Sequence, residues 1–458
     1  MEYRTEHDSM GEVQVPAWAL WGAQTERSRR NFPIGVGLEP MPIEIIRAFA
    51  QIKKAAALSN RVLLPETMTE EKCAAICEAA DAILDGSLTA HFPLVVWQTG
   101  SGTQSNMNVN EVIANYGNAQ AGKALLHPND DVNLSQSSND TFPTALHVAA
   151  VRSVEGGLLS AVDGLIASLR RLESENGDVL KIGRTHLQDA TPLRFSQEIS
   201  GWRGSLEQDR RMLLAALPPL REIALGGTAV GTGLNAPKGF DLLAAETLSE
   251  LTGSSFVSAP NKFHALTSLD ELVFVHGAIK ALAADLMKIA NDVRLLASGP
   301  RCGLGEIEIP ANEPGSSIMP GKVNPTQCEQ LTMAAVQVLG NDTAIGIAAS
   351  QGNFELNVFL PVCAYNFLQS SRLLAESVRS FTERCVRGIR ANRERMAQNV
   401  ERSLMLATAL SPYVGYEKAA RIAQTAAERG ISLREACVES GLLSAERFDE
   451  IVRPERMV

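Results

Sequence analysis

Apolar residues recur every three or four positions along several long stretches of the chain. The longest such stretch runs from Thr267 to Ser298 and contains no proline. Because residues three or four apart share one face of an α-helix, it predicts a helix of about nine turns with one face in the core. Its apolar positions are Leu269, Leu272, Val273, Ile279, Leu282, Leu286, Ile289, Val293 and Leu296.

The same spacing appears over residues 44–58, 158–172 and 329–347. Long amphipathic helices bury their apolar faces by packing side by side, so we expect an all-α fold with a long central helical bundle. One chain has few ways to cover faces of that length, and aromatic residues make up only 5% of it. We therefore expect identical chains to assemble around the bundle.

The ends of the chain differ from its middle. Residues 1–138 mix helical pieces with loops that contain glycine and proline, and shorter helices alternate with loops after about residue 354. We therefore predict three domains: a mostly helical N-terminal domain over residues 1–138, the long-helix bundle over 139–354 and a small helical C-terminal domain over 355–458.

Composition and charge narrow the function classes. The 458 residues carry a formal net charge of -10 with scattered basic residues, so nucleic acid is not an expected partner. No stretch offers the ~20 uninterrupted apolar residues of a membrane span, and the N-terminus lacks an apolar run, which favours a cytoplasmic protein. The seven cysteines show no metal-ligand spacing, so we expect buried thiols and no metal site.

Candidate chemistry lies in polar, glycine-rich segments between the helices. The first is TGSGTQSNMN, Thr99–Asn108, whose hydroxyls, amides and glycine-exposed N–H groups suit a carboxylate or a phosphate. An ordinary polar loop with a helix N-cap has the same composition. It does not match the G-x-G-x-x-G fingerprint, and GGTAVGTG at 226–233 lacks the lysine of a phosphate-binding loop, so nucleotide binding is unsupported.

Two further segments carry donors and a titratable group. HPNDDVNLSQSSND, residues 127–140, precedes an apolar-periodic helix, and its side-chain donors exceed what one helix cap needs. GRTHLQDATP, residues 183–192, contains His186, one of only seven histidines. A buried structural histidine is the commoner reading, but His186 is also the best available group for moving a proton near neutral pH.

The fourth segment is GSSIMPGKVNP, residues 315–325. Lys322 and Asn324 lie two apart in an extended stretch, where both side chains can face one carboxylate. Gly315 and Gly321 favour a mobile loop. Ser316 would serve as a base only where N–H donors and Lys322 stabilise its alkoxide, and a plain surface turn is the alternative.

Together these motifs resemble the fumarase/aspartase superfamily, in the same order and at similar separations, over nearly the whole chain. THLQDATP with its histidine and the continuation GKVNPTQCE resemble the class II fumarases, since aspartases carry glutamine at the histidine position. The resemblance implies an all-α, three-domain homotetramer with active sites shared among three subunits, and neither a metal nor an organic cofactor. It also implies reversible hydration of fumarate to L-malate through an aci-carboxylate intermediate.

The resemblance also implies a role for individual residues. Ser316 would take the proton from C3 of malate, His186 would act on the water at C2, and Glu329 would orient His186. The implied substrate-binding residues are Ser101, Gly102, Thr103, Ser137, Ser138, Asn139, Thr185, Ser317, Lys322 and Asn324.

Some positions depart from the family pattern. Leu134 stands where the family commonly has lysine, and RFSQE at Arg194–Glu198 replaces a TLGQE-like sequence. A possible secondary dicarboxylate site maps onto His127, Asn129 and Asp130, but the three residues before it, Ala124, Leu125 and Leu126, include no cation. Two alternatives remain: a related lyase acting on mesaconate or aspartate, the latter disfavoured by His186, and a non-catalytic scaffold.

Overall fold

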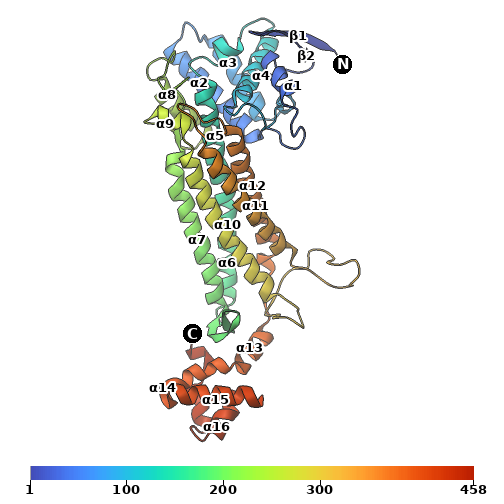
Figure 1. Ribbon diagram of the computed structural model, residues 1–458, viewed down its shortest axis with the longest axis vertical. Coiled ribbons are helices and arrows are strands. Elements are labelled where there is room, and N and C mark those ends of the chain that lie inside the picture. The colour runs from blue at the N-terminus through green and yellow to red at the C-terminus, as the bar shows by residue number, and fades with distance from the viewer. Residues whose placement is uncertain (1) are drawn as a thin grey trace. The chain divides into compact units, whose positions relative to one another are not determined.

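The computed structural model describes residues 2–458, and α-helices dominate it, as the sequence predicts (Figure 1). The chain divides into two compact units, each assembled from three separate segments. Unit 1 comprises Met1–Ser160, Asp209–Ala283 and Val336–Ala375, and unit 2 comprises Ala161–Gln208, Ala284–Ala335 and Glu376–Val458. Four long helices pass from one unit into the other, so the units do not follow the order of the sequence. The division into three domains stays a prediction.

Helix α2 lies at the centre of the part of unit 1 formed by residues 2–160 and 222–267. The hairpin β1–β2 lies beside α1 (Figure 1), and α2 packs on α3, α5 and α8. Phe49 of α2 meets Phe142 of α5 edge to face, with ring centroids 5.7 Å apart. The elements are β1 Tyr3–Asp8, β2 Gly11–Pro16, α1 Ala23–Asn31, α2 Ile43–Leu63, α3 Glu70–Leu84, α4 Thr103–Ala121, α5 Ser138–Arg152, β5 Glu222–Ile223, α8 Phe240–Thr252, β6 Val257–Ser258 and α9 Lys262–Thr267.

The periodic stretches form the long helices that the sequence predicts. They are α6 Ser160–Glu175, α7 Phe195–Leu220, α10 Asp270–Leu296, α11 Thr326–Ala349 and α12 Leu360–Arg384. The predicted helix at Thr267 begins late, because Ser268 adopts an extended backbone between α9 and α10. Helix α2 confirms the prediction for residues 44–58.

The expectation of only shorter helices after residue 354 is wrong. Helix α12 has 25 residues, because apolar positions such as Leu360, Phe367 and Leu374 recur at helical spacing and are fully buried. Short helices follow only after α12. These are α13 Arg393–Arg402, α14 Ser411–Val414, α15 Tyr416–Arg429, α16 Leu433–Glu439 and α17 Ala445–Ile451.

Polar side chains tie the long helices together within each unit. In unit 1, buried His276 of α10 hydrogen-bonds Asp342 Oδ1 of α11 through Nδ1 and Ser370 Oγ of α12 through Nε2, both at 2.9 Å. In unit 2, Trp202 Nε1 of α7 donates to Asp292 Oδ2 of α10 at 2.9 Å. These contacts fix the register between neighbouring helices.

Residues 138–175 form one continuous helical stretch, in which the π-helical turn Ser153–Leu159 joins α5 to α6. Its length and composition would suffice to cross a membrane, but 67% of its most apolar window is buried inside the protein. Such burial is typical of a core helix.

Two antiparallel strand pairs and a set of thiols complete the description. In unit 2, β3 Leu180–Thr185 pairs with β4 Gln188–Arg194, and β7 Ile307–Glu308 pairs with β8 Arg390–Ala391. All seven cysteines are free thiols. The prediction of buried thiols is confirmed for five of them and is wrong for exposed Cys302; Cys77 is half-buried. The buried five are Cys73, Cys328, Cys363, Cys385 and Cys437.

Candidate active site

Two helix N-termini lie close together in unit 1. Gly102 precedes α4 with φ of 72°, and a Cβ atom there would lie 1.9 Å from the ring of Phe142 in α5. Only glycine fits both the backbone conformation and this close approach. Ser101 Oγ and Thr103 Oγ1 share a hydrogen bond of 2.9 Å at the same N-terminus. The first motif therefore presents free N–H groups and hydroxyls at one helix end.

The turn before α5 is held by a capping box. Asp140 Oδ1 accepts from the Ser137 N–H at 2.9 Å, and Ser137 Oγ accepts from the Asn139 N–H at 3.2 Å. Asp140 Oδ2 also accepts from the N–H groups of Gly226 and Thr228, both at 2.9 Å. Burial raises the pKa of Asp140 to about 6 against the opposing effect of these hydrogen bonds. The turn that carries Ser137, Ser138 and Asn139 is thus preformed.

Asn106 joins the two N-termini. Its Nδ2 donates to Ser138 Oγ at 2.9 Å, and its Oδ1 accepts from Thr141 Oγ1 at 3.1 Å. The side chain is fully buried. Sequence reasoning counted Asn106 among the polar residues of the first motif but gave it no role. The structure brings the predicted groups at 101–103 and 137–139 to one place.

His186 occupies the tip of the β3–β4 hairpin. Thr185 pairs with Gln188, which leaves His186 and Leu187 as a two-residue turn with φ values of 56° and 60°. Such a turn favours Asn-Gly, and residues with a Cβ atom are strained there. The strain persists because hydrogen bonds from Arg184 to Glu306 anchor the hairpin. Thr185 and His186 are both exposed. The backbone therefore presents the imidazole outward.

A buried charge network supports this hairpin. Arg184 makes two hydrogen bonds to Glu306, at 2.6 and 3.0 Å, and Lys181 Nζ donates to Glu198 Oε2 at 2.7 Å. Burial alone would raise the pKa of Glu306, but the hydrogen bonds from Arg184 and the charge of Lys181 hold that pKa below its ordinary value. Glu306 therefore anchors β3 as a charged group.

The loop over residues 315–325 is closed by its own backbone. The Gly315 N–H donates to the Lys322 carbonyl at 3.0 Å, and a Cβ atom on Gly315 would lie 2.5 Å from that carbonyl oxygen. Lys322 Nζ donates to Asn324 Oδ1 at 2.8 Å, and Asn324 Nδ2 donates to the Gly315 carbonyl at 2.8 Å. Gly315 thus permits a close packing contact, and the cation and the amide lie together.

Two backbone N–H groups donate to the side chain of Ser316. Its Oγ accepts from the backbone N–H groups of Ile318 and Met319, at 3.3 and 3.0 Å. Two donors aimed at one oxygen stabilise negative charge on it. Ser317 and Lys322 are exposed beside it.

The predicted residues are divided between the two units. Residues 101–103 and 137–139 belong to unit 1, whereas Thr185, His186 and the loop at 315–325 belong to unit 2. Within residues 2–458, no side-chain hydrogen bond joins His186 to Glu329, which is exposed in the first turn of α11. The orienting role of Glu329 stays a prediction.

Comparison with known proteins identifies the family of the chain. Residues 11–340 match a lyase family model, and residues 406–458 match a model of the fumarase C C-terminus. Class II fumarate hydratase of Bacillus cereus is 62% identical over 100% of this chain and 99% of its own, and that of Helicobacter pylori is 58% identical over the same shares. The crystal structure of class II fumarase from Schistosoma mansoni has a TM-score of 0.97 at 43% identity, covering 100% of this chain and 99% of that one.

The chain belongs to the class II fumarate hydratases.

Of the two departures from the family pattern, only Arg194 makes a side-chain contact that accounts for it. Leu134 is half-buried and its backbone carbonyl accepts from Asn60 Nδ2 and Gln136 Nε2, both at 3.0 Å, but nothing in the structure explains the leucine side chain. Arg194 donates from Nη1 to the Gly177 carbonyl at 2.8 Å, so its side chain serves the end of the hairpin.

The segment predicted as a possible secondary dicarboxylate site borders a cavity of about 480 Å³. His127 Nδ1 accepts from the N–H groups of Asn129 and Asp130, at 3.3 and 3.2 Å. Glu6, Asp8 and Glu111 line the cavity, and its lining includes no lysine or arginine among the described residues. This charge pattern disfavours an anion.

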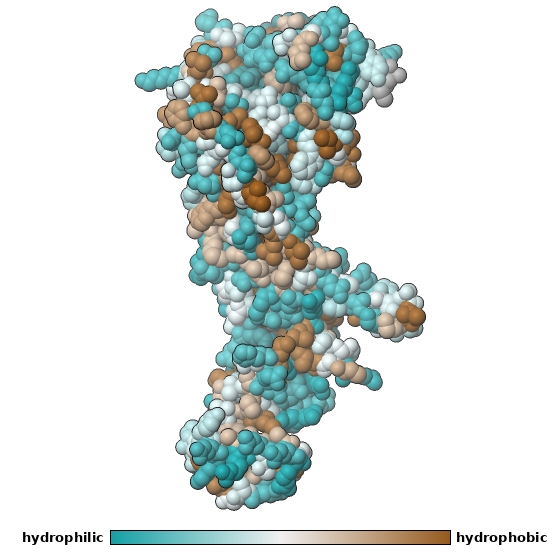
Figure 2. All heavy atoms as spheres, in the orientation of Figure 1, coloured by the Kyte–Doolittle hydropathy of each residue, from teal (hydrophilic) through white to brown (hydrophobic). Residues whose placement is uncertain are grey.

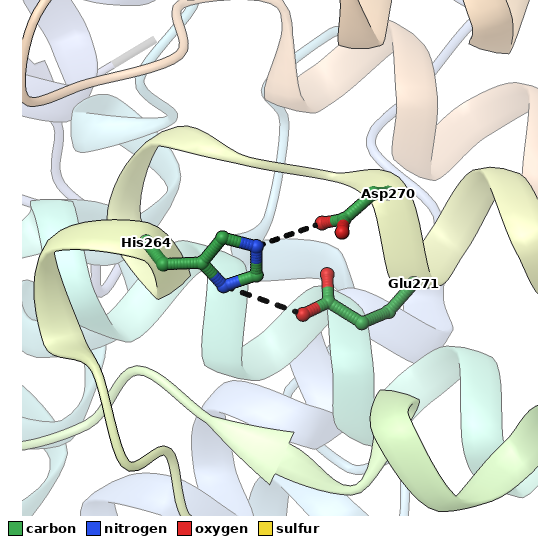
Figure 3. A group of neighbouring side chains, drawn as sticks. All are labelled: His264, Asp270 and Glu271. Carbon is green, nitrogen blue, oxygen red and sulfur yellow. Dashed lines mark ion pairs between the residues drawn. The ribbon is translucent and has the colours of Figure 1, made fainter.

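A cluster that the sequence did not predict links the end of α9 to the start of α10 (Figure 3). His264 Nε2 lies 3.1 Å from Asp270 Oδ1, and Nδ1 lies 3.6 Å from Glu271 Oε1. Each ring nitrogen faces a different carboxylate, whereas a single ion would bind only one of them. The geometry therefore fits a pair of ion pairs better than a chelate.

Proposed function

We propose that the chain catalyses the reversible hydration of fumarate to L-malate. The observation that carries the proposal is the match to class II fumarate hydratases over the full length, at 62% identity. The position and contacts of the predicted residues support the same reaction, as follows.

The preformed site in unit 1 suits a carboxylate. Two helix N-termini contribute free N–H groups and partial positive charge, and Ser101, Thr103 and Ser138 add hydroxyl donors. Asn139 Nδ2 is held by the Ala229 carbonyl at 2.8 Å. One carboxylate of a C4 dicarboxylate would bind here, and Thr185, Ser317, Lys322 and Asn324 would hold the remainder of the substrate.

Ser316 is the proposed base. Removing the C3 proton of malate moves charge onto the neighbouring carboxylate and creates an aci-carboxylate dianion. The two N–H donors to Ser316 Oγ support its alkoxide, and Lys322 and the helix N-termini would stabilise the dianion more strongly than the ground state.

His186 is the proposed group that assists the water at C2, with Glu329 as its orienting partner. The strained turn fixes the imidazole at an exposed tip. Proton transfer at C3 and departure of hydroxide at C2 together yield fumarate and water, so no step requires a metal or an organic cofactor. Turnover is expected to persist after dialysis against EDTA.

We further propose a homotetramer in which three subunits build each active site. Met333, Val336 and Ile347 are 67%, 62% and 60% exposed and lie on one face of α11, and Figure 2 shows hydrophobic side chains gathered in patches. An exposed apolar stripe on a long helix is typical of an interface. Light scattering should give four times the chain mass of 49.2 kDa.

Mixing two inactive variants tests the shared site. Ser138→Asp would repel the substrate carboxylate, and Ser316→Ala would remove the base. Mixed tetramers should recover part of the parent activity, because some sites would combine intact residues from different chains. If both residues of a site came from one chain, mixing would restore nothing.

The central experiment follows the loss of the ultraviolet absorbance of fumarate, with mesaconate and with fumarate plus ammonium in parallel. Loss with fumarate alone and formation of L-malate would support the proposal. Turnover of a parallel substrate alone would favour the related lyase, and silence throughout would favour the scaffold. We propose a cytoplasmic location, which cell fractionation tests.

A further inference from the structure

Lys53 is a buried cation that the proposed reaction does not use. It lies in α2, and its side chain is fully buried. Its ammonium donates to two neutral amide oxygens, Asn133 Oδ1 at 3.0 Å and Gln136 Oε1 at 2.9 Å. Among residues 2–458, no carboxylate lies within ion-pair distance of it. An uncompensated buried ammonium is costly, so its presence calls for a role.

The contacts of Lys53 lead directly to the candidate substrate site. Asn133 Oδ1 also accepts from Asn106 Nδ2 at 3.2 Å. The same Asn106 Nδ2 donates to Ser138 Oγ. Gln136 precedes the capping box, and its Nε2 is held by the Leu134 carbonyl at 3.0 Å. Lys53 is therefore linked to the proposed substrate-binding turn through Asn133, Asn106 and Gln136.

We propose that Lys53 is a positioning residue and the buried positive charge of the dicarboxylate site. Its hydrogen bonds fix the amide oxygens under the turn at Ser137–Asn139, and its charge adds to the attraction of the turn for a substrate carboxylate. The inference rests on the proposed function in that the occupant is taken to be a C4 dicarboxylate.

The charge of Lys53 is expected to depend on pH and on the ligand. Burial lowers the pKa of Lys53 to about 7, and the charge of Asp140 on α5 opposes that effect. A bound dicarboxylate favours the ammonium and raises this pKa. In the free protein Lys53 loses its proton as the pH rises through about 7, so dicarboxylate affinity should fall between pH 6.5 and 9.

Two other titratable groups interact with the same region, and they are Asp140 and Lys262. Burial raises the pKa of Asp140 to about 6. Lys262 on α9 is half-buried and donates to the Ile223 carbonyl at 2.9 Å, and its partial burial lowers its pKa to about 8. Because the pKa of Lys262 is lowered in the same direction, Lys262→Met is the control for the loss of a nearby lysine.

Two variants separate position from charge. Lys53→Met removes both the hydrogen bonds and the charge. Gln136→Glu keeps an acceptor for Lys53, loses the hydrogen bonds from Nε2 to the Val132 and Leu134 carbonyls, and adds a carboxylate whose negative charge offsets the charge of Lys53 at the turn. Both should raise KM for fumarate about tenfold at pH 6.5, with a smaller loss in kcat, and both should remove the rise in KM between pH 6.5 and 9.

The experiment measures fumarate kinetics and succinate binding by calorimetry at pH 6.5, 7.5 and 9 for the parent, both variants and Lys262→Met. Lys262→Met should stay within about twofold of the parent at pH 6.5. If Lys53→Met and Gln136→Glu keep the parent affinities and pH dependence, the proposal is overturned. If Gln136→Glu alone behaves as the parent, the charge is not used and the proposal also fails. A parent that binds succinate without hydrating fumarate would refute the proposed function and still test Lys53.

Discussion

The turn in unit 1 differs from the hairpin and the loop in unit 2 in burial and in hydrogen bonding. Asn106 and Asp140 are buried, and each holds its partners through hydrogen bonds within one chain. His186 and Lys322, by contrast, are exposed on a strained turn and a short loop. The contrast indicates that the proposed carboxylate-binding turn of unit 1 is preformed, whereas His186 and Lys322 lie at exposed positions, where the proposed assembly would complete the site.

The largest expected effect comes from removing the proposed base. Ser316→Ala should lower kcat for fumarate about a thousandfold, because no other hydroxyl receives the N–H groups of Ile318 and Met319. Ser350→Ala, at an exposed position near the end of α11, is the matched control and should keep the parent rate. Near-normal turnover by Ser316→Ala would remove this serine from the mechanism.

A smaller loss is expected at the hairpin tip. His186→Asn should lower kcat about a hundredfold and leave the fold intact, because asparagine tolerates the positive φ of this position. Leu187→Asn is the control: it should keep turnover and raise the free energy of unfolding by up to ~1 kcal/mol through relief of strain. Equal activity losses in both variants would show that the turn, and not the imidazole, matters.

The close approach at Gly102 tests the rigidity of the buried region. Gly102→Ala should lower the free energy of unfolding by roughly 3 kcal/mol, because the new Cβ atom would overlap the Phe142 ring at a positive φ. Gly122→Ala, at a φ of 64° in open space, should cost only about 1 kcal/mol. Chemical denaturation measures both free energies of unfolding. Equal losses in the two variants would mean that the Phe142 ring moves aside at little cost.

The sequence predicted the long helices well, since periodic apolar positions decide them. The prediction missed the length of α12. It also missed the burial of Lys53, because a lysine between apolar residues usually keeps its ammonium group in solvent. The His186–Leu187 turn carries no Asn-Gly signal. Residues 101–103 and 137–139 are joined by the hydrogen bond from Asn106 to Ser138. These two residues are 32 positions apart, so no local sequence pattern predicts the contact.

The last effect concerns stability and is confined to acidic pH. Burial lowers the pKa of His147 to about 4, so this neutral histidine contributes stability that is present above pH 6.5 and is lost as the pH falls through 4. His147→Gln should flatten the free energy of unfolding over that range by up to ~3 kcal/mol. Denaturant titrations check this, with His7→Gln at an exposed position expected to keep the parent profile. An unchanged slope in His147→Gln would contradict the buried neutral state.

The division between binding and proton transfer is tested most directly by titrating succinate into a chain that carries both His186→Asn and Ser316→Ala. The account predicts that this inactive protein binds succinate within about twofold of the parent, because the preformed turn of unit 1 is untouched. A loss of affinity of tenfold or more would contradict the account and place His186 or Ser316 among the binding groups.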